Sequence, residues 1–388
     1  MLRMLMTAML LLLATPSDLL AKPQTVSPPS RNNELTKLAR QIEPDLVGRV
    51  DRLPQYLEFF RAKRGNDTRL FAFRVQAVTT ATGNVRLQGY VEFSQTRAGL
   101  IGFLKTLGFE IVDEELENLP AKGLGKKAFG LVKTTHTLSY NRPTEPRNVV
   151  TDCLLGEPLY LLREEGDYLL THSGEGYLGY VAAADVYRVD AKAFDLYPTE
   201  SSVRMIADHT LSTGLVIPTG ALLKRLPSDD GSVLCALPTG AVVKISRAAC
   251  EPSKLPTAQI DRAIDVGKQL LGTPYHWGGK TSEGIDCSGL VQVAFASTGV
   301  HLPRDSNQQF LLGQLTATRW HRSGLRRGDT LYFLGLNGRI RHTALYLGND
   351  RFLQAEMPVV NIRSLNPAHD DYEAKRAESF AFGKRLRQ

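Results

Sequence analysis

Residues 273–290 read TPYHWGGKTSEGIDCSGL, and this stretch decides the fold of the C-terminal part of the chain. A glycine-rich loop leads into Cys287, and the residues from Cys287 to Ser297 form an apolar run that predicts a helix. The first N–H groups of a helix and its dipole favour a thiolate, so we predict that Cys287 is a nucleophile. The same N–H groups can stabilise an oxyanion.

A purely structural role is the alternative for these residues. Cys287 can be a small buried side chain, and Asp286 or Ser288 can cap the helix. An isolated Asp-Cys-Ser favours that role. The glycine-rich loop and a downstream histidine favour the catalytic role.

The downstream histidine is His342, which opens an apolar strand at 342–347. Gly348 begins a turn signal, and residues 352–355 predict a returning strand. If the hairpin centres on Gly348, His342 and Gln354 lie opposite each other, about 5 Å apart at Cβ. Gln354 then holds one ring nitrogen and leaves the other to take the thiol proton. An ordinary polar cross-strand pair is the alternative.

Three further motifs accompany these residues: LPRDS at 302–306, LRRGD at 325–329 and HTALYLG at 342–348. Together with 273–290 they resemble the NlpC family of papain-like cysteine peptidases, from about residue 257 to the C-terminus. Members of that family hydrolyse amide bonds of peptidoglycan stem peptides, usually between γ-D-glutamate and a diamino acid. The resemblance implies an acyl transfer through a thioester.

The resemblance also implies roles for individual residues. Cys287 is the expected nucleophile, His342 the base and Gln354 the orienting residue. The residues expected to line the substrate groove are Tyr275, Asp286, Ser288 and Ser306. The orienting position is often histidine in the family, and a neutral amide can hold the imidazole but cannot stabilise the imidazolium by charge. We expect Arg304 to be a surface salt-bridge partner.

The N-terminus reads as a targeting signal. Arg3 precedes an apolar run that includes Ala8 to Ala14, and a plausible cleavage site follows before Lys22. We therefore predict a signal peptide at 1–21, with a retained anchor as the alternative. The expected location is the periplasm, the cell envelope or the exterior, with no integral membrane segment after signal removal.

The 388 residues are too many for one core, so we predict several domains. A linker at 22–33 precedes an α+β domain at 34–139, whose role the residues do not reveal. Its predicted helices are 53–63 and 98–107, and its predicted strands are 70–75 and 85–91.

Short β runs follow, with turn signals between them. Residues 140–190 resemble a bacterial SH3 domain through 142–145, 155–157 and 176–181, and residues 195–252 resemble it more weakly. The predicted fold class is therefore α+β. In this prediction, two small SH3-like β-barrels and the N-terminal α+β domain precede a papain-like domain at 257–388.

The first SH3-like region suggests a specificity gate. In some relatives such a domain closes one end of the groove and reads the free amine of an N-terminal L-alanine. Glu145 could pair with that ammonium, and Tyr180 could wall the pocket. The alternative is a solvated Glu145 and a Tyr180 in the barrel core.

Cysteines, charge and motifs limit the possible partners. Cys235 and Cys250 could form a disulfide or remain buried thiols. The sequence contains no Cys/His cluster with the spacing of a zinc site, and we expect no metal or cofactor. The net charge of +7 favours anionic partners, but the basic residues are scattered, which disfavours nucleic acid. We expect peptidoglycan stem peptides or muropeptides as partners. Two functional alternatives stay open: a wall-binding protein with weak catalysis, and an amidase or acyltransferase.

Overall fold

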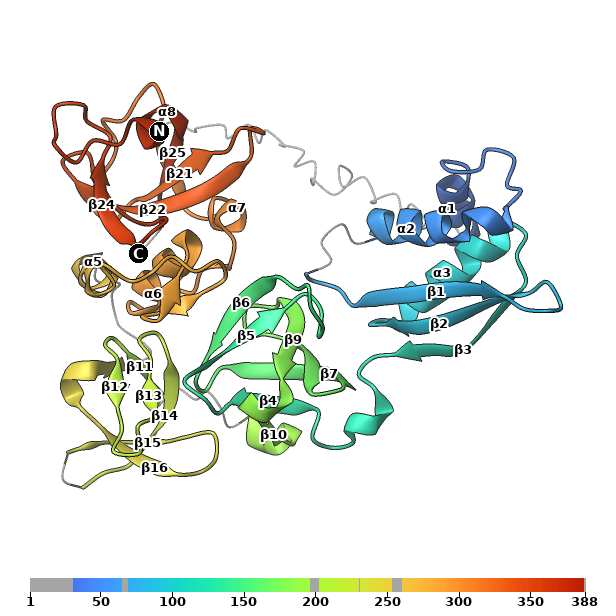
Figure 1. Cartoon of the computed structure of the whole chain (residues 1–388), viewed down its shortest axis with the longest axis horizontal. Coiled ribbons are helices and arrows are strands. Elements are labelled where there is room, and N and C mark those ends of the chain that lie inside the picture. The colour runs from blue at the N-terminus through green and yellow to red at the C-terminus, as the bar shows by residue number, and fades with distance from the viewer. Residues whose placement is uncertain (1–30, 65–68, 196–201, 230, 253–259, 387–388) are drawn as a thin grey trace, which may run out of the picture.

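The computed structural model describes residues 31–64, 69–195, 202–229, 231–252 and 260–386. The expected signal peptide and most of the expected linker lie outside these ranges. Figure 1 shows four parts in chain order: an N-terminal α+β part, two β modules and a C-terminal α+β part. Within the described ranges, no helix has both the length and the apolar character needed to span a membrane.

The N-terminal part packs helices on a small sheet. The helices are α1 (Arg31–Ala39), α2 (Leu53–Arg64) and α3 (Ser94–Thr106), and the strands are β1 (Phe73–Thr79), β2 (Val85–Val91) and β3 (Ile111–Asn118). β2 lies between β1 and β3, antiparallel to the first and parallel to the second. Phe60, Leu100 and Phe103 fill the core between helices and sheet. Both predicted helices and both predicted strands are present, with β1 shifted toward the C-terminus.

The first β module, residues 129–189, is a seven-stranded sheet. Its strands are β4 (Phe129–Val132), β5 (His136–Tyr140), β6 (Val149–Leu154), β7 (Pro158–Glu165), β8 (Tyr168–His172), β9 (Leu178–Ala182) and β10 (Val186–Val189), and a short helix, α4 (Ala191–Phe194), follows. The strand order is β10-β4-β7-β8-β9-β5-β6. The sheet therefore includes two strands, β4 and β5, that begin before residue 140, where we expected the module to begin. Pairing between distant strands decides this boundary, and local patterns do not show it.

The second β module, residues 202–252, is smaller. Its main strands are β11 (Ser202–Met205), β14 (Leu222–Leu226), β15 (Val233–Ala236), β16 (Val242–Ile245) and β17 (Cys250–Pro252), and β12 (His209–Thr210) pairs with β13 (Val216–Ile217). Cys235 and Cys250 are both buried in its core as free thiols. The expectation that both modules are SH3-like barrels stays a prediction.

The C-terminal part packs helices on one six-stranded sheet. The helices are α5 (Ile260–Gln269), α6 (Cys287–Ala296), α7 (Ser306–Gln309) and α8 (Ala374–Ser379). A two-stranded ladder, β18 (Lys280–Thr281) with β19 (Gly284–Ile285), precedes α6. The sheet order is β20 (Gln314–Thr318), β25 (Phe380–Arg385), β21 (Thr330–Leu334), β22 (Ile340–Gly348), β23 (Arg351–Ala355) and β24 (Val360–Ser364). Leu290 and Val291 of α6 pack with Leu345 and Leu353 of the sheet in one core.

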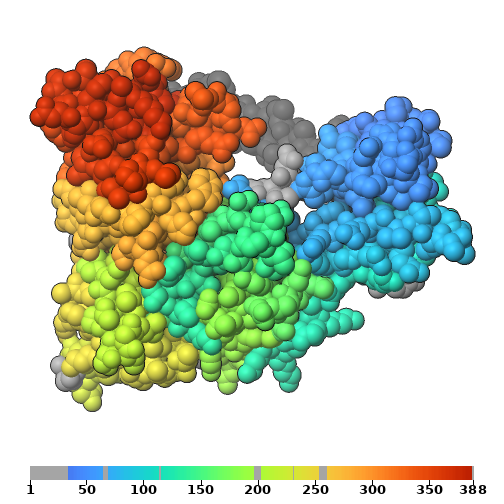
Figure 2. Space-filling view, in the orientation of Figure 1, coloured from blue at the N-terminus to red at the C-terminus, as the bar shows by residue number. Residues whose placement is uncertain are grey.

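The first β module is in close contact with the loop before α6. Trp277 Nε1 donates to the carbonyl of Val149 at 3.2 Å, and a Cβ on Gly278 would come within 2.2 Å of the Val149 side chain. Lys280 Nζ reaches Glu175 at 2.7 Å, with both side chains largely buried. Figure 2 shows the green first module between the blue N-terminal part and the orange C-terminal part. These contacts place another part of the chain beside Cys287.

Candidate active site

Cys287 is the first residue of α6, as the sequence predicts. The preceding Asp286 caps the helix by accepting from the N–H of Gly289 at 2.7 Å, and its other oxygen accepts from the N–H of Gly278 at 2.8 Å. The glycine-rich loop is thus tied to the helix start. Asp286 has the structural role considered above, and Cys287 is placed where helix N–H groups lack a helical acceptor.

Arg304 corrects one expectation. We expected it at the surface, but it is only 2% exposed. Its Nη1 and Nη2 donate to the two carboxylate oxygens of Asp286 at 3.0 and 2.7 Å, and Nη1 also donates to the hydroxyl of Ser288 at 2.8 Å. The fixed fork of a guanidinium suits this paired contact. The arginine therefore braces the helix start that presents Cys287.

The thiol of Cys287 is neutral at this buried position in the cleft. Burial, with a smaller contribution from the charge of Asp286, raises the pKa of Cys287 to about 12, although the backbone N–H groups of Thr343 and Ser288 act in the opposite direction. We expected the helix start to favour the thiolate. Desolvation outweighs that effect because the side chain is almost fully buried.

His342 and Gln354 are in contact. His342 Nε2 lies 2.8 Å from Gln354 Oε1. The predicted register is wrong by two residues: Leu345 pairs with Leu353, and on that count His342 lies two residues from the position opposite Gln354, as its diagonal neighbour. Diagonal neighbours remain within reach of long side chains. The hydrogen-bonded pair is therefore confirmed, while the register we derived it from is not.

Two residues that the sequence did not reveal fix the Gln354 amide. Gln354 Nε2 donates to Glu373 Oε2 at 2.7 Å, and Gln354 Oε1 accepts from Arg376 Nε at 3.1 Å. The amide oxygen therefore faces His342, and an oxygen can only accept. His342 must carry its proton on Nε2, which leaves Nδ1 unprotonated and able to take a proton.

The electrostatic surroundings keep His342 neutral. Burial and the nearby positive charge of Arg376 lower the pKa of His342 to about 3, while the hydrogen bond to Gln354 and the charge of Glu356 act in the opposite direction. Arg376 also donates to Glu356 at 2.9 Å, which offsets part of its charge. A neutral thiol and a neutral imidazole with a free Nδ1 are thus the resting state of the pair.

Two hollows meet at Cys287. The inner hollow, about 580 Å³, is lined by Asp286, Cys287, Ser288 and Ser306, and also by Arg69 and Val150 from the parts that precede the C-terminal part. The outer hollow, about 930 Å³, is lined by Tyr275, Cys287 and His342 together with exposed apolar side chains such as Trp320 and Leu336. The structure therefore brings all the residues expected in the groove to one cleft, with Cys287 between its halves.

Glu145 and Tyr180 are not among the residues that line this cleft. The Glu145 side chain is 73% exposed and pairs with Arg147 at 2.8 Å. Tyr180 is buried and bonds to Tyr90 at 2.8 Å and to Glu165 at 3.1 Å. The first module instead sends a different tyrosine to the catalytic part.

That tyrosine is Tyr177, which lies in the motif at 176–181 and which we had not expected to have a role at the cleft. Its hydroxyl donates to Asp305 Oδ2 at 2.7 Å, and Arg69 from the N-terminal part pairs with the same oxygen and lies over the Tyr177 ring. Asp305 begins α7, next to Ser306. Three parts of the chain therefore meet at the inner hollow. Among the residues that the structure describes, no group of three or more His, Cys, Asp or Glu side chains could hold a metal ion.

The C-terminal part is similar to known proteins. The sequence model of the NlpC/P60 family matches residues 272–377. Dipeptidyl-peptidase 6 of Lysinibacillus sphaericus is 28% identical over 255 residues, which cover 60% of this chain and 90% of that protein. Gamma-D-glutamyl-L-lysine dipeptidyl-peptidase of Bacillus cereus is 26% identical over 232 residues, which cover 55% of this chain and 68% of that protein. Peptidoglycan endopeptidase RipA of Mycobacterium tuberculosis is 37% identical over 105 residues, 24% of this chain and 21% of that protein.

Solved structures share the fold. An NlpC/P60 family protein from Bacillus cereus superposes with a TM-score of 0.57 at 20% identity and covers 66% of this chain and 99% of its own. At that identity the likeness concerns the fold alone. Taken with the match at 272–377 and the Cys287–His342 cleft, it leads to one conclusion: the chain carries a C-terminal domain of the NlpC/P60 family.

Proposed function

We propose that this protein is a cysteine peptidase that hydrolyses the γ-D-glutamyl-diamino acid amide bond of peptidoglycan stem peptides. The observation that carries the proposal is the arrangement at the cleft: Cys287 begins a helix, and the Gln354 amide orients His342 with Nδ1 free. Relatives named for γ-D-glutamyl-L-lysine and peptidoglycan cleavage support the substrate class.

The proposed reaction begins with a proton transfer. As Cys287 Sγ attacks the carbonyl carbon of the γ-glutamyl amide, its proton passes to His342 Nδ1. The N–H groups at the start of α6 stabilise the oxyanion of the tetrahedral intermediate. The imidazolium then protonates the departing amine, and the acyl group remains on Cys287 as a thioester.

Water completes the cycle. His342, neutral again, takes a proton from the water that attacks the thioester, and the carboxylic acid leaves as Cys287 recovers its proton. The imidazolium formed in each step lies near Arg376, whose charge opposes it, and near Glu356, whose charge favours it. The chemistry in these steps uses only groups of this chain and water.

We also propose that the cleft accepts a peptide with a free N-terminus. Two relatives, whose matches cover 60% and 55% of this chain, are named dipeptidyl-peptidases, and that class releases a dipeptide from a free end. In this chain, Val150 of the first module and Arg69 bound the inner hollow. The dipeptide L-Ala-γ-D-Glu would occupy this hollow, on the acyl side of Cys287.

The ammonium of such a peptide needs a carboxylate. Glu145, which we expected in this role, points to solvent and pairs with Arg147. Asp305 lines the inner hollow, is about 21% exposed, and is held by the Tyr177 hydroxyl and the Arg69 guanidinium, both at Oδ2. We assign the gate to Asp305 and Tyr177 in place of Glu145 and Tyr180.

The proposed location is outside the cytoplasm, in the envelope or beyond, as the N-terminal sequence predicts. Peptidoglycan lies there, and a net charge of +7 suits an anionic wall. N-terminal sequencing of natively expressed protein tests the export. A chain that keeps Met1 in the cytoplasm would contradict it.

The proposed activity is tested with defined peptides and mass spectrometry. We expect the free tripeptide L-Ala-γ-D-Glu-diamino acid to yield L-Ala-D-Glu and the diamino acid. The same peptide linked to muramic acid should be cut much more slowly. In the Tyr177→Phe variant, the rates of cleavage of the free and the linked peptide should lie closer together. Cleavage at another bond would refute the bond assignment, and equal rates on both peptides would refute the gate.

A further inference from the structure

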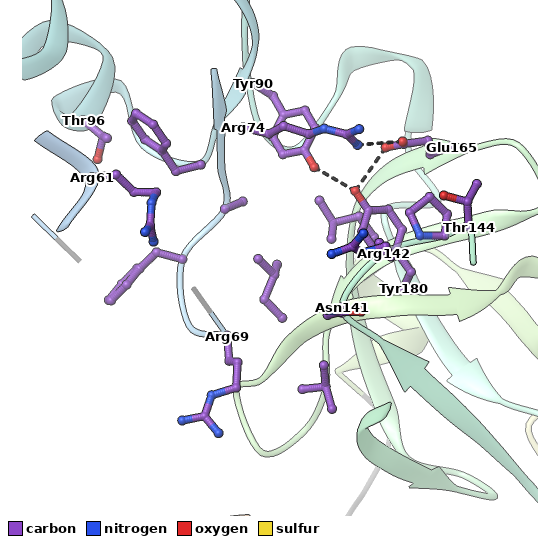
Figure 3. Close-up of a pocket in the computed structure, with 18 of the residues that line it drawn as sticks. Arg61, Arg69, Arg74, Tyr90, Thr96, Asn141, Arg142, Thr144, Glu165 and Tyr180 are labelled. Atoms are coloured by element: carbon purple, nitrogen blue, oxygen red, sulfur yellow. Dashed lines mark hydrogen bonds and ion pairs between the residues drawn. The ribbon is translucent and has the colours of Figure 1, made fainter. Parts of the chain in front are cut away.

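A second pocket lies outside the catalytic cleft, between the N-terminal part and the first β module. It has a volume of about 670 Å³ (Figure 3), within the range typical of small-molecule sites. Arg69 and Val150 line both this pocket and the inner hollow, so the two cavities are neighbours. The mechanism proposed above uses none of the remaining residues of this pocket.

The lining is strongly basic. It contains four arginines, Arg61, Arg69, Arg74 and Arg142, and one carboxylate, Glu165. Figure 3 shows Arg61 and Arg142 on opposite sides of the open centre. An ammonium is therefore disfavoured in this pocket, and an anion is favoured.

Three of these arginines have carboxylate partners. Arg74 pairs with Glu165 at 2.8 Å, Arg61 with Glu58, and Arg69 with Asp305. Arg142 is exposed, and in the described ranges it has no hydrogen-bonding or ion-pair partner. Its guanidinium is the group with free capacity for a carboxylate, which it can hold through two parallel N–H donors.

Aromatic rings form another face of the pocket. The rings of Phe71 and Phe93 lie edge to face with their centroids 6.2 Å apart, and the two residues are 48% and 44% exposed. Two neighbouring phenyl rings left open to solvent inside a concave site offer an apolar platform. The flat faces of a sugar ring can pack on such a platform, while Asn141 and Thr96 provide polar groups for its hydroxyl and amide substituents.

A hydrogen-bond network forms the floor of the pocket. Tyr90 and Tyr180 join their hydroxyls at 2.8 Å, and the Tyr180 hydroxyl also donates to Glu165 at 3.1 Å. Burial, together with the bond to Tyr90, raises the pKa of Tyr180, so the hydroxyl stays protonated. Tyr90 comes from the N-terminal part and Tyr180 from the first module, so this network holds the two walls together. Tyr180, which we expected at the catalytic gate, supports this pocket instead.

We propose that this pocket binds a carboxylate-bearing amino sugar of the glycan strand, of the muramic acid type. The Arg142 guanidinium holds the carboxylate of the lactyl group, and the sugar ring lies on Phe71 and Phe93. This assignment gives a function to the junction between the N-terminal part and the first module. Binding requires neither Cys287 nor His342.

Such a sugar site would give the enzyme a place in a reaction sequence, a step that rests on the proposed function. Hydrolysis of the amide between the lactyl group and L-alanine adds water and leaves a carboxylate on the sugar and a free amine on the peptide. An amidase of this class must supply the free peptide proposed as substrate. The same reaction creates the anionic sugar that the pocket would hold, so the enzyme would be retained where its substrate is released.

The test compares two sugars that differ in the lactyl carboxylate, N-acetylmuramic acid and N-acetylglucosamine. Ligand-observed NMR titrations use the full chain carrying Cys287→Ala, so the readout is independent of hydrolysis. We expect N-acetylmuramic acid to bind at least about tenfold more tightly than N-acetylglucosamine, a difference of about 1.4 kcal/mol.

Three further variants localise the site. Arg142→Ala and Phe93→Ala should each weaken N-acetylmuramic acid binding about five- to tenfold. Arg86→Ala, which removes an exposed arginine on β2 outside the pocket, should leave binding unchanged. In a chain that keeps Cys287, the Arg142→Ala variant should cleave the free tripeptide at the parent rate. Failure of N-acetylmuramic acid to bind, equal binding of both sugars, or binding that Arg142→Ala and Phe93→Ala leave unchanged would each overturn the proposal, whatever the hydrolysis assay shows.

Discussion

Arg304 holds both carboxylate oxygens of Asp286, at 3.0 and 2.7 Å, and both side chains are almost fully buried. Burial acts to raise the pKa of Asp286, but the charge and hydrogen bonds of Arg304 outweigh it, so the pKa lies below its ordinary value. Asp286 remains ionised and continues to cap α6. The position of Cys287 thus depends on a buried ion pair eighteen residues apart in the sequence.

We predict that Arg304→Ala destabilises the protein by about 3–5 kcal/mol, because it leaves the Asp286 charge buried without a partner. Arg304→Lys should fold but lose activity, since an ammonium cannot hold both oxygens. Thermal unfolding and peptide hydrolysis measure the two effects. Arg327→Ala, which breaks the exposed pair with Asp261, is the matched control and should change stability by less than about 1 kcal/mol. Parent-like stability of Arg304→Ala would contradict this role.

The orienting amide yields a graded prediction. His342→Ala should lower kcat by about 10²–10⁴-fold, because the general base is lost. Gln354→Ala should lower it less, since Gln354 orients the ring and transfers no proton. Steady-state kinetics on the free tripeptide distinguish the two. Equal losses, or no loss in Gln354→Ala, would show that the 2.8 Å contact does not orient the base.

Local sequence patterns predicted the elements of the C-terminal part well. The helix that Cys287 begins, the strand containing His342 and the contact with Gln354 are all present, because a glycine-rich loop and short apolar strands bounded by turn residues leave clear signals. Contacts between residues far apart in the sequence could not be predicted from such patterns. Arg304 is polar and its burial follows only from its pairing with Asp286, and Arg376 lies on α8, which no motif marked.

The pKa of Cys287 could not be predicted from the local sequence. A helix start favours a thiolate, but the amount of burial around Cys287 is a property of the whole cleft, and it determines the direction of the pKa shift. The expectation that Glu145 and Tyr180 line the groove differs from the structure for a similar reason. Glu145 and Tyr177 both belong to the first module, and only the packing of that module beside α7 shows that Tyr177, and not Glu145, contacts Asp305 at the inner hollow.

Alkylation should report the protonation state of the thiol. With a pKa of about 12, the Cys287 thiolate fraction rises about tenfold for each pH unit between pH 6 and 9, and the iodoacetamide rate should follow it. Cys287 should still react faster than Cys153, Cys235 and Cys250, because it lines an open cleft. Peptide mapping after timed alkylation measures all four. A rate that is constant above pH 5 would indicate a preformed thiolate-imidazolium pair instead.

The hydrogen bonds of His136, to Asp152 within the first module and to Glu283 of the catalytic part, should depend on pH. The hydrogen bond to Asp152 is the main cause that raises the pKa of His136 to about 8, and Glu283 of the catalytic part adds to it at 3.4 Å. The folded-state pKa is above the ordinary 6.5, so this stabilisation is complete below about pH 6.5 and disappears as the pH rises through 8.

We expect a loss on the order of 1 kcal/mol across that window, because solvent partly screens the imidazole. His136→Ala should remove this component from the pH dependence of the melting temperature. His209→Ala, on the second module, is the control and should keep it. Identical pH profiles for the parent and His136→Ala would contradict the assignment.

The central claim is that Cys287 cleaves the γ-D-glutamyl bond. Its most direct test is quantitative mass spectrometry of L-Ala-D-Glu released from the free tripeptide by three proteins: the parent, Cys287→Ala and Cys250→Ala. Cys250 is a buried free thiol of the second module, so its replacement controls for the loss of any cysteine. We predict that Cys287→Ala releases the dipeptide at least about 10⁴-fold more slowly than the parent, and that Cys250→Ala, once shown to be folded, works at close to the parent rate. Dipeptide release by a folded Cys287→Ala at a rate near that of the parent would contradict the account.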